Sequence, residues 1–234
     1  PDPASRLQDG DVHGHSVVVG PDRYPWRHTG WRGRPWQDSV IYEAHAGLCG
    51  GYAGLRRRLP EVARLGVTLL ELMPIADFPG PRNWGYDGVL PYAPDTAYGT
   101  PDELKALIDA AHGLEMGVML DVVYNHFGPD GNYLHRYAAD FFDARADTPW
   151  GAAIDYRQQA VQRYFIDNAL YWLRKYRFDG LRLDAVHAMG RTDWLAGLAR
   201  EARAACAQAP AALLARALGE GYVYQGQAAP TRGG

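Results

Sequence analysis

Short apolar runs alternate four times with segments of helical periodicity, and this alternation limits the possible folds more than any other feature. The runs are residues 39–43, 67–72, 118–123 and 178–187. Their apolar character indicates strands that are buried on both faces. Strands separated by helices form a parallel sheet covered by helices, either an open doubly wound sheet or an eight-stranded barrel.

Polar residues favour the barrel, because they gather where the strands end. No glycine-rich dinucleotide or P-loop motif follows a strand, so nucleotide binding has no support. Sites at the carboxyl ends of strands are typical of barrels. We therefore predict an α/β chain of the (β/α)₈ TIM-barrel type, in which only about the first four β/α units are present.

Local signals set the ends of several predicted elements. The run 39–43 is predicted to be a buried strand, and Pro60 is predicted to split or kink the helix after it. Thr100, Pro101 and Glu103 give an N-cap, a first-turn proline and a capping box, so a helix begins there and buries a stripe that extends to Leu114.

Composition excludes several classes of function. A net charge of −3 gives no reason to expect nucleic acid or an anionic membrane as a partner. There is no apolar run of about 18 residues and no signal-type start, so we expect no membrane and a cytoplasmic protein. Cys49 and Cys206 lie far apart and form no metal or disulfide framework. The chain begins without a Met, and we expect it to be part of a longer protein.

Arg182 and Asp184 lie two residues apart in the fourth strand, so their side chains point to the same side. A guanidinium beside a carboxylate keeps the carboxylate ionised and oriented, and such a carboxylate can attack an electrophilic carbon. For an isolated pair of this kind, a purely structural ion pair is the more common explanation.

A second polar group follows the third strand. Asp121 lies in that strand, and Asn125 and His126 lie just beyond its end. With Arg182 and Asp184 they form a predicted cluster on adjacent strand ends, although buried Asp and His often only satisfy backbone groups. Trp84 and Tyr86 lie in the first long loop, where sugar stacking and packing of the loop on its own core are equally compatible with the sequence. His45 and His112 are predicted to be core or helix histidines. No zinc spacing occurs and no metal site is predicted, although loop Asp and Asn side chains suit calcium.

These motifs together resemble the α-amylase superfamily of glycoside hydrolases and transglycosylases. Residues 121–126 and 180–187 are similar to its third-strand and fourth-strand motifs. Residues 71–80, 83–88, 125–133 and 1–6 resemble the malto-oligosyltrehalose trehalohydrolases in particular. Glycogen branching enzymes share the frame and match these loops less well.

The resemblance implies a retaining mechanism, no cofactor and an α-glucan substrate. Asp184 would be the nucleophile, with Arg182 beside it and Asp121 orienting Arg182. Tyr86 would stack on the sugar, with Trp84 as a further contact. His126 and His187 would bind sugar hydroxyls. The bond cleaved would be the α-1,4 bond next to the terminal trehalose of maltooligosyl-trehalose, a step of trehalose biosynthesis.

The sequence departs from the family after Asp184. A retaining glycosidase needs a second carboxyl about 5 Å from the nucleophile, and the family motif that supplies it is absent. Of the later acids, Asp193 and Glu201 are predicted to face solvent, and Glu220 lies in a segment that resembles a later part of the trehalohydrolases.

We therefore predict an apron or linker at 1–38, the first half of a catalytic barrel at 39–207, and a displaced tail at 208–234. Near residues 206–212 the sequence would skip the family segment that contains the acid. Such a copy would have little or no activity. The alternatives are a branching enzyme-like transglycosylase and a non-catalytic glucan-binding remnant.

Overall fold

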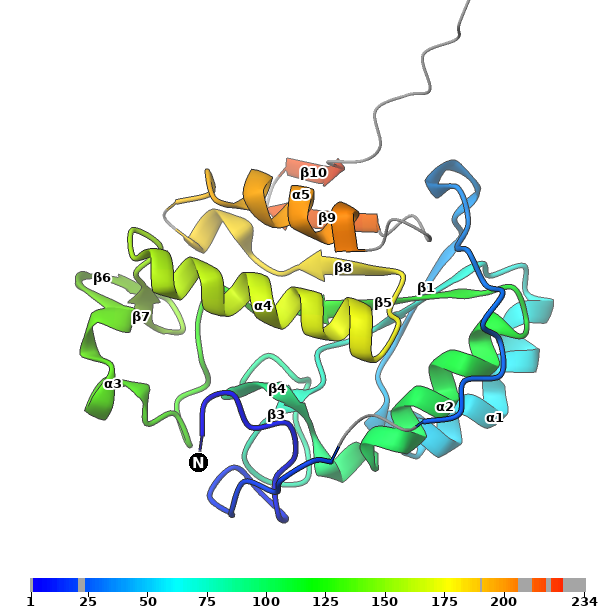
Figure 1. Cartoon of the computed structure of the whole chain (residues 1–234), viewed down its shortest axis with the longest axis horizontal. Helices are drawn as coiled ribbons and strands as arrows, with labels where there is room; N and C mark the ends of the chain where they lie inside the picture. The colour runs from blue at the N-terminus through cyan, green and yellow to red at the C-terminus, as the bar shows by residue number, and fades with distance from the viewer. Residues whose placement is uncertain (1, 21–23, 190, 206–211, 218–219, 225–234) are drawn as a thin grey trace, which may run out of the picture.

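The computed structural model describes residues 2–20, 24–189, 191–205, 212–217 and 220–224. Its centre is a six-stranded sheet in the order β1-β2-β5-β8-β9-β10 (Figure 1). The first four strands correspond to the predicted apolar runs and are parallel to one another: β1 (Ile41–Ala44), β2 (Leu69–Leu72), β5 (Gly117–Val122) and β8 (Gly180–Leu183). The parallel α/β sheet expected from the sequence is confirmed.

Two further strands extend this sheet. β9 (Ala212–Ala217) pairs with β8 in parallel, and β10 (Glu220–Tyr224) pairs with β9 in the antiparallel direction. The prediction of four units is therefore not confirmed. Within the described residues the sheet remains open, because β1 and β10 form its two edges and do not pair with each other.

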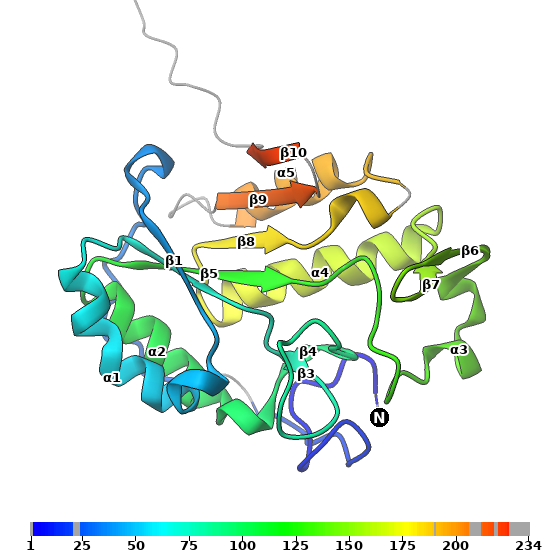
Figure 2. The ribbon, with the colours of Figure 1, turned by 180° about the vertical axis from the view of Figure 1, so that it is seen from behind.

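Helices follow the strands and cover one face of the sheet. They are α1 (Gly51–Arg64), α2 (Pro101–His112), α4 (Gln159–Lys175) and α5 (Leu195–Ala205). Seen from behind, strands β5, β8 and β9 lie in front of α4 and α5, so the opposite face carries no helix in the part of the chain that is described (Figure 2). No described helix is long and apolar enough to cross a membrane.

The capping box at Thr100 is confirmed: its hydroxyl accepts a hydrogen bond from the Glu103 backbone, and the Glu103 carboxylate accepts one from the Thr100 backbone. The predicted stripe is buried except at its end. Helix α2 stops at His112, so Leu114 lies beyond it and is 40% exposed.

Two local predictions are wrong. β1 is mostly exposed, with Tyr42 at 44%, because it is an edge strand with a neighbour on one side only. Helix α1 continues through Pro60 without a break. Pro60 lies on the exposed side of the helix, where the backbone bond that it cannot make leaves a carbonyl accessible to water.

Each of the two long loops folds into a small antiparallel sheet of its own. The loop after β2 contains β3 (Ala76–Asp77) and β4 (Leu90–Pro94). The loop after β5 contains β6 (Phe142–Thr148) and β7 (Gly151–Ile154). The remaining short elements are α3 (Leu134–Tyr137), η1 (Trp36–Asp38), η2 (Gly47–Cys49), η3 (Thr96–Tyr98), η4 (Ala139–Phe141) and η5 (Val186–Met189).

The described part of segment 1–38 contacts the core at widely spaced points. The indole of Trp31 donates to Asp179 at 2.6 Å, and the hydroxyl of Tyr164 donates to the carbonyl of Pro3 at 2.6 Å. Trp31 and Pro3 therefore join this segment to the residues that flank β8 and to α4. Cys49 is free and partly buried, whereas Cys206 lies outside the described residues.

A buried pair of carboxyls in the β3–β4 hairpin predicts an unusual pH dependence. Burial and the neighbouring Asp95 raise the pKa of Asp77 to about 8, and its Oδ2 has no described hydrogen-bond donor. The folded state therefore holds a proton that the unfolded chain releases near pH 4, so stability should fall as the pH rises from 4 to 8. Asp77→Asn should flatten this fall and stabilise the protein at pH 8 by more than about 1 kcal/mol.

Urea unfolding at pH 5 and pH 8 measures this effect. Asp102→Asn, at an exposed carboxylate of α2, is the control and should keep the wild-type dependence. A pH profile that Asp77→Asn leaves unchanged would show that Asp77 is not the titrating group.

Candidate active site

The parallel register of β5 and β8 places Asp121 directly opposite Arg182. The guanidinium donates to Asp121 Oδ2, and the same Nη1 lies 2.8 Å from Asp184 Oδ1. Both strands are buried along their whole length, and the side chain of Asp121 is completely buried. The predicted cluster of Asp121, Arg182 and Asp184 is therefore assembled, with Asp184 as its accessible carboxylate at 19% side-chain exposure.

The charges in this cluster depend on one another. Burial opposes the charge of Arg182, but Asp121 and Asp184 raise the pKa of its guanidinium, so Arg182 stays protonated. Burial raises the pKa of Asp121, with Arg182 acting in the opposite direction. Tyr86 also donates to Asp121 Oδ2 at 3.0 Å, and burial and Asp121 raise the pKa of Tyr86, which keeps its hydroxyl neutral.

A strained turn follows β8 directly after Asp184. Ala185 has a φ of 41°, in the left-handed region that residues with a side chain rarely adopt. The side chain of Asn125, at the end of β5, donates to the Asp184 carbonyl at 2.9 Å. Backbone strain of this kind is common at functional sites, and Asn125 provides a hydrogen bond that holds the turn.

The loop of residues 83–87 brings two aromatic side chains to the same end of the sheet. Tyr86 points to Asp121, whereas Trp84 is 65% exposed. Trp84 lines a pocket of about 420 Å³ together with His45, Leu48 and other residues of the loop. His45 is therefore not the predicted core histidine: its Nε2 donates to the carbonyl of Asn83 at 2.7 Å and supports this loop.

Gly85 allows Tyr86 to take this position, and its replacement should be costly. Gly85 has a φ of 98°, and a Cβ there would lie 2.0 Å from the carbonyl oxygen of Pro74. Gly85→Ala should destabilise the protein by about 3 kcal/mol or more, since left-handed strain and a backbone clash add. Gly80→Ala is the matched control: its φ is 80° with open space around it, so only about 1 kcal/mol is expected. Equal losses of unfolding free energy for Gly85→Ala and Gly80→Ala, measured in urea, would contradict a clash with Pro74.

His126 lies beneath a tryptophan that sequence reasoning missed. Trp150, in the turn between β6 and β7, stacks on His126 with a centroid distance of 5.3 Å. His126 Nε2 donates to the Tyr86 carbonyl at 2.9 Å, its Nδ1 contacts Asn125, and burial lowers its pKa. The predicted contact of His126 with sugar hydroxyls stays a prediction. A tryptophan in a Thr-Pro-Trp-Gly turn was the available signal.

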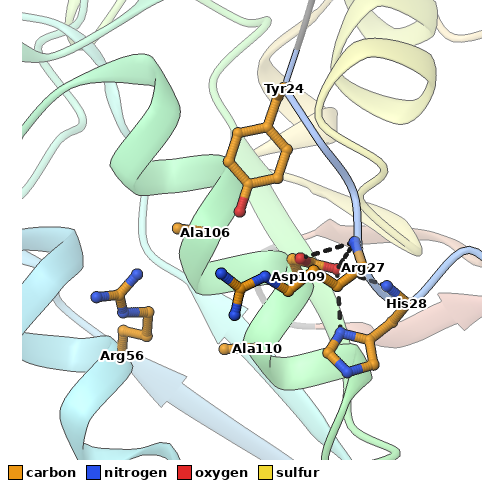
Figure 3. Close-up of a pocket in the computed structure, with 7 residues that line it drawn as sticks. All are labelled: Tyr24, Arg27, His28, Arg56, Ala106, Asp109 and Ala110. Atoms are coloured by element: carbon orange, nitrogen blue, oxygen red, sulfur yellow. Dashed lines mark hydrogen bonds and ion pairs between the residues drawn. The ribbon is translucent and has the colours of Figure 1, made fainter.

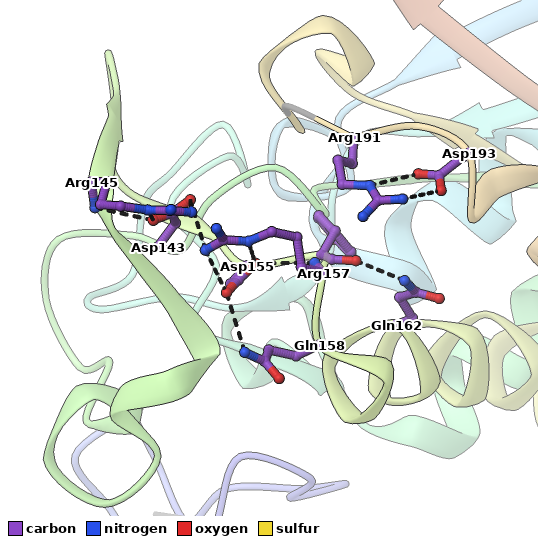
Figure 4. Close-up of polar contacts among 9 residues, drawn as sticks. Asp143, Arg145, Asp155, Arg157, Gln158, Gln162, Arg191 and Asp193 are labelled. Atoms are coloured by element: carbon purple, nitrogen blue, oxygen red, sulfur yellow. Dashed lines mark hydrogen bonds and ion pairs between the residues drawn. The ribbon is translucent and has the colours of Figure 1, made fainter.

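Charged pairs hold the hairpin that carries Trp150 (Figure 4). Arg157 bonds both oxygens of Asp155, at 2.7 and 2.8 Å, and reaches Asp143 of β6 at 3.0 Å. Arg157 therefore joins the hairpin to the segment that leads into α4, and so supports the position of Trp150.

The other predicted residues lie as follows. His187 is exposed on η5, and its contact with substrate stays a prediction. His112 is a buried helix residue, as predicted, and its Nε2 bonds Asp179 at 2.9 Å. The carboxylates of Glu43, Glu71 and Asp121 each offer an oxygen within 4.8 Å of the others, a grouping that suits a cation. Arg182 already contacts Asp121 and supplies positive charge there.

Comparison with known proteins defines the class. The family profile described as "Alpha amylase, catalytic domain" matches residues 5–148. The chain belongs to this family, whose members the sequence motifs resemble.

Particular relatives lie within this family. A malto-oligosyltrehalose trehalohydrolase of Deinococcus radiodurans is 47% identical over 86% of this chain and 34% of its own length. A Salmonella typhimurium crystal structure, described as an alpha amylase, has a TM-score of 0.89 and 49% identity, and the match covers 92% of this chain and 38% of that one. A type I pullulanase of Bacillus subtilis, solved with maltose, has a TM-score of 0.77 and 26% identity over 87% of this chain and 35% of that one. The chain spans about a third of the length of the curated relatives it matches.

Proposed function

We propose that this chain carries the nucleophile side of a retaining α-glucan hydrolase site that acts on maltooligosyl-trehalose, at the α-1,4 bond next to the terminal trehalose. The observation that carries the proposal is the Arg182 guanidinium held between the buried Asp121 and the accessible Asp184. In this role Asp184 attacks the anomeric carbon, and Arg182 and Asp121 fix its position. The similarity to trehalohydrolases supports the choice of substrate.

Aromatic side chains around the cluster suit a sugar ligand. Trp84 and Trp150 are exposed by 65% and 41%, which is unusual for residues of their size. Flat apolar rings with a polar handle stack on pyranose rings. Together with Tyr86, whose hydroxyl bonds Asp121, these two residues would give the substrate three aromatic contacts.

We also propose that the chain lacks the general acid. Asp193 is exposed and paired with Arg191 at 3.0 Å, and Glu201 pairs with Arg163 of α4 at 2.8 Å, on the helical side of the sheet. The side chain of Glu220 lies outside the described residues. Asp121 is buried too completely to reach a glycosidic oxygen. The division into 1–38, 39–207 and 208–234 is part of this proposal.

The experiment compares binding and turnover of maltooligosyl-trehalose. Calorimetric titration should show binding that Trp84→Ala weakens about tenfold or more, the loss expected for one stacked aromatic ring. Trehalose release should be little or none, because the leaving oxygen has no acid to protonate it.

Each outcome separates one part of the proposal. Clear trehalose release that Asp184→Asn removes would show that an acid is present. Formation of α-1,6 branches on a glucan would favour the branching enzyme alternative. Binding without any reaction of Asp184, even with an activated donor, would favour the glucan-binding remnant, and absence of binding would contradict a glucan ligand.

A further inference from the structure

A second pocket lies on the helical side of the molecule, lined by residues from three separate elements. Its volume is about 390 Å³. Segment 24–28 forms one wall, Arg56 of α1 forms another, and Ala106, Asp109 and Ala110 of α2 form the base (Figure 3). Alanines four residues apart on one face of α2 leave the base open.

Among the described residues that line this pocket, Asp109 supplies the carboxylate, and the protein already uses it. Asp109 accepts hydrogen bonds from the backbone of Arg27 at 3.1 Å, the backbone of His28 at 3.0 Å and the His28 ring at 3.1 Å. Burial opposes ionisation, but these bonds lower the pKa of Asp109. Asp109 therefore anchors segment 24–28 as an ionised acceptor.

The guanidinium groups of Arg27 and Arg56 differ from Asp109 in this respect. Among the described residues, neither the Arg27 nor the Arg56 guanidinium forms a hydrogen bond or an ion pair, and in Figure 3 both point into the space above Ala106 and Ala110. The hydroxyl of Tyr24 points into the same space. Like charges that face one another are unfavourable, and an anion between them removes this cost.

We propose that this pocket binds a phosphate monoester, with the phosphoryl group between Arg27 and Arg56 and within reach of the Tyr24 hydroxyl. Guanidinium forks bind phosphate oxygens in pairs of parallel hydrogen bonds. Two forks on different sides suit a tetrahedral group, which presents oxygens to both, better than a planar carboxylate. The pocket is also larger than a phosphate ion, so it has room for the organic part of the ester.

A bound phosphoryl group would join the N-terminal segment to α1 and α2. These elements are far apart in the sequence, so binding should stabilise the folded chain. The site lies outside the Asp184 cluster and does not depend on the proposed hydrolase function, since none of its lining residues belongs to that cluster.

The test is calorimetric titration of the 234-residue chain with inorganic phosphate and with glucose 6-phosphate, at constant ionic strength. We expect saturable binding of both, with glucose 6-phosphate tighter. Arg27→Ala and Arg56→Ala should each weaken it about tenfold or more. Arg58→Ala, at an exposed position on α1 that does not line the pocket, should bind as the wild type does.

Arg56→Lys keeps the charge and should retain part of the affinity, and circular dichroism confirms that each variant is folded. Binding of phosphate without binding of glucose 6-phosphate would contradict the proposal that the ligand is a phosphate monoester. Equal binding by Arg27→Ala and the wild type, equal binding of acetate, or absence of saturable binding would overturn the site.

Discussion

Asp184→Asn is expected to abolish the reaction of this chain with α-maltotriosyl fluoride. Under the proposed mechanism, the Asp184 carboxylate of the wild type attacks the anomeric carbon, the carbon–fluorine bond breaks, and fluoride leaves with the bonding electrons and needs little protonation. Without a general base the glycosyl ester should persist, so about one equivalent of fluoride is released rapidly and the protein gains the mass of a maltotriosyl group. The variant should react at least about 1,000-fold more slowly, because an amide is a poor nucleophile.

Fluoride release and intact-protein mass measure this directly. Asp193→Asn is the control, since Asp193 is exposed and paired with Arg191, and it should react as the wild type does. Equal fluoride release by Asp184→Asn and the wild type would show that Asp184 is not the nucleophile. Repeated turnover of the fluoride would show that a general base is present.

Arg182→Ala should have the largest effect on stability of any single exchange in the site. It leaves Asp121 fully buried without its cation, and removal of one partner of a buried pair costs about 3–5 kcal/mol. Because burial already raises the pKa of Asp121, the variant should hold a proton that the unfolded chain releases, so its loss of stability should be greater at pH 8 than at pH 5.

Urea unfolding of two further variants tests the cause. Arg163→Ala removes a guanidinium from an exposed pair with Asp167 and Glu201 and should cost about 1 kcal/mol or less. Arg182→Met with Asp121→Leu removes both buried charges and should recover much of the lost stability. If Arg182→Ala were as stable as Arg163→Ala, the expected cost of leaving Asp121 buried without its cation would be contradicted.

The strand and helix pattern was predictable because it follows from burial. β2, β5 and β8 are buried on both faces and so appear as continuous apolar runs, and the cap at Thr100 is a local signal. The exposure of β1 was not predictable, because it depends on β1 having a neighbouring strand on one side only. The extension of the sheet by β9 depends on long-range pairing that no local pattern specifies.

The residues of the site also divide into those that the sequence predicts and those that it does not. The Arg182 and Asp184 pair could be inferred from strand alternation, and its partner Asp121 from the position of polar residues at strand ends. Trp150 was missed because its contact with His126 results from a hairpin within a long loop that has no clear periodicity. His45 was misjudged for a similar reason: its partner Asn83 belongs to another loop.

The register between β5 and β8 also has a consequence for folding kinetics. Asp121 and Arg182 are 61 residues apart, and their contact forms only when the crossover through α4 brings the two strands together. Contacts of such sequence separation carry a large loop-closure cost and form slowly. The ion pair between Asp121 and Arg182 should therefore be absent from early compact species, and its formation should report the final docking of the sheet.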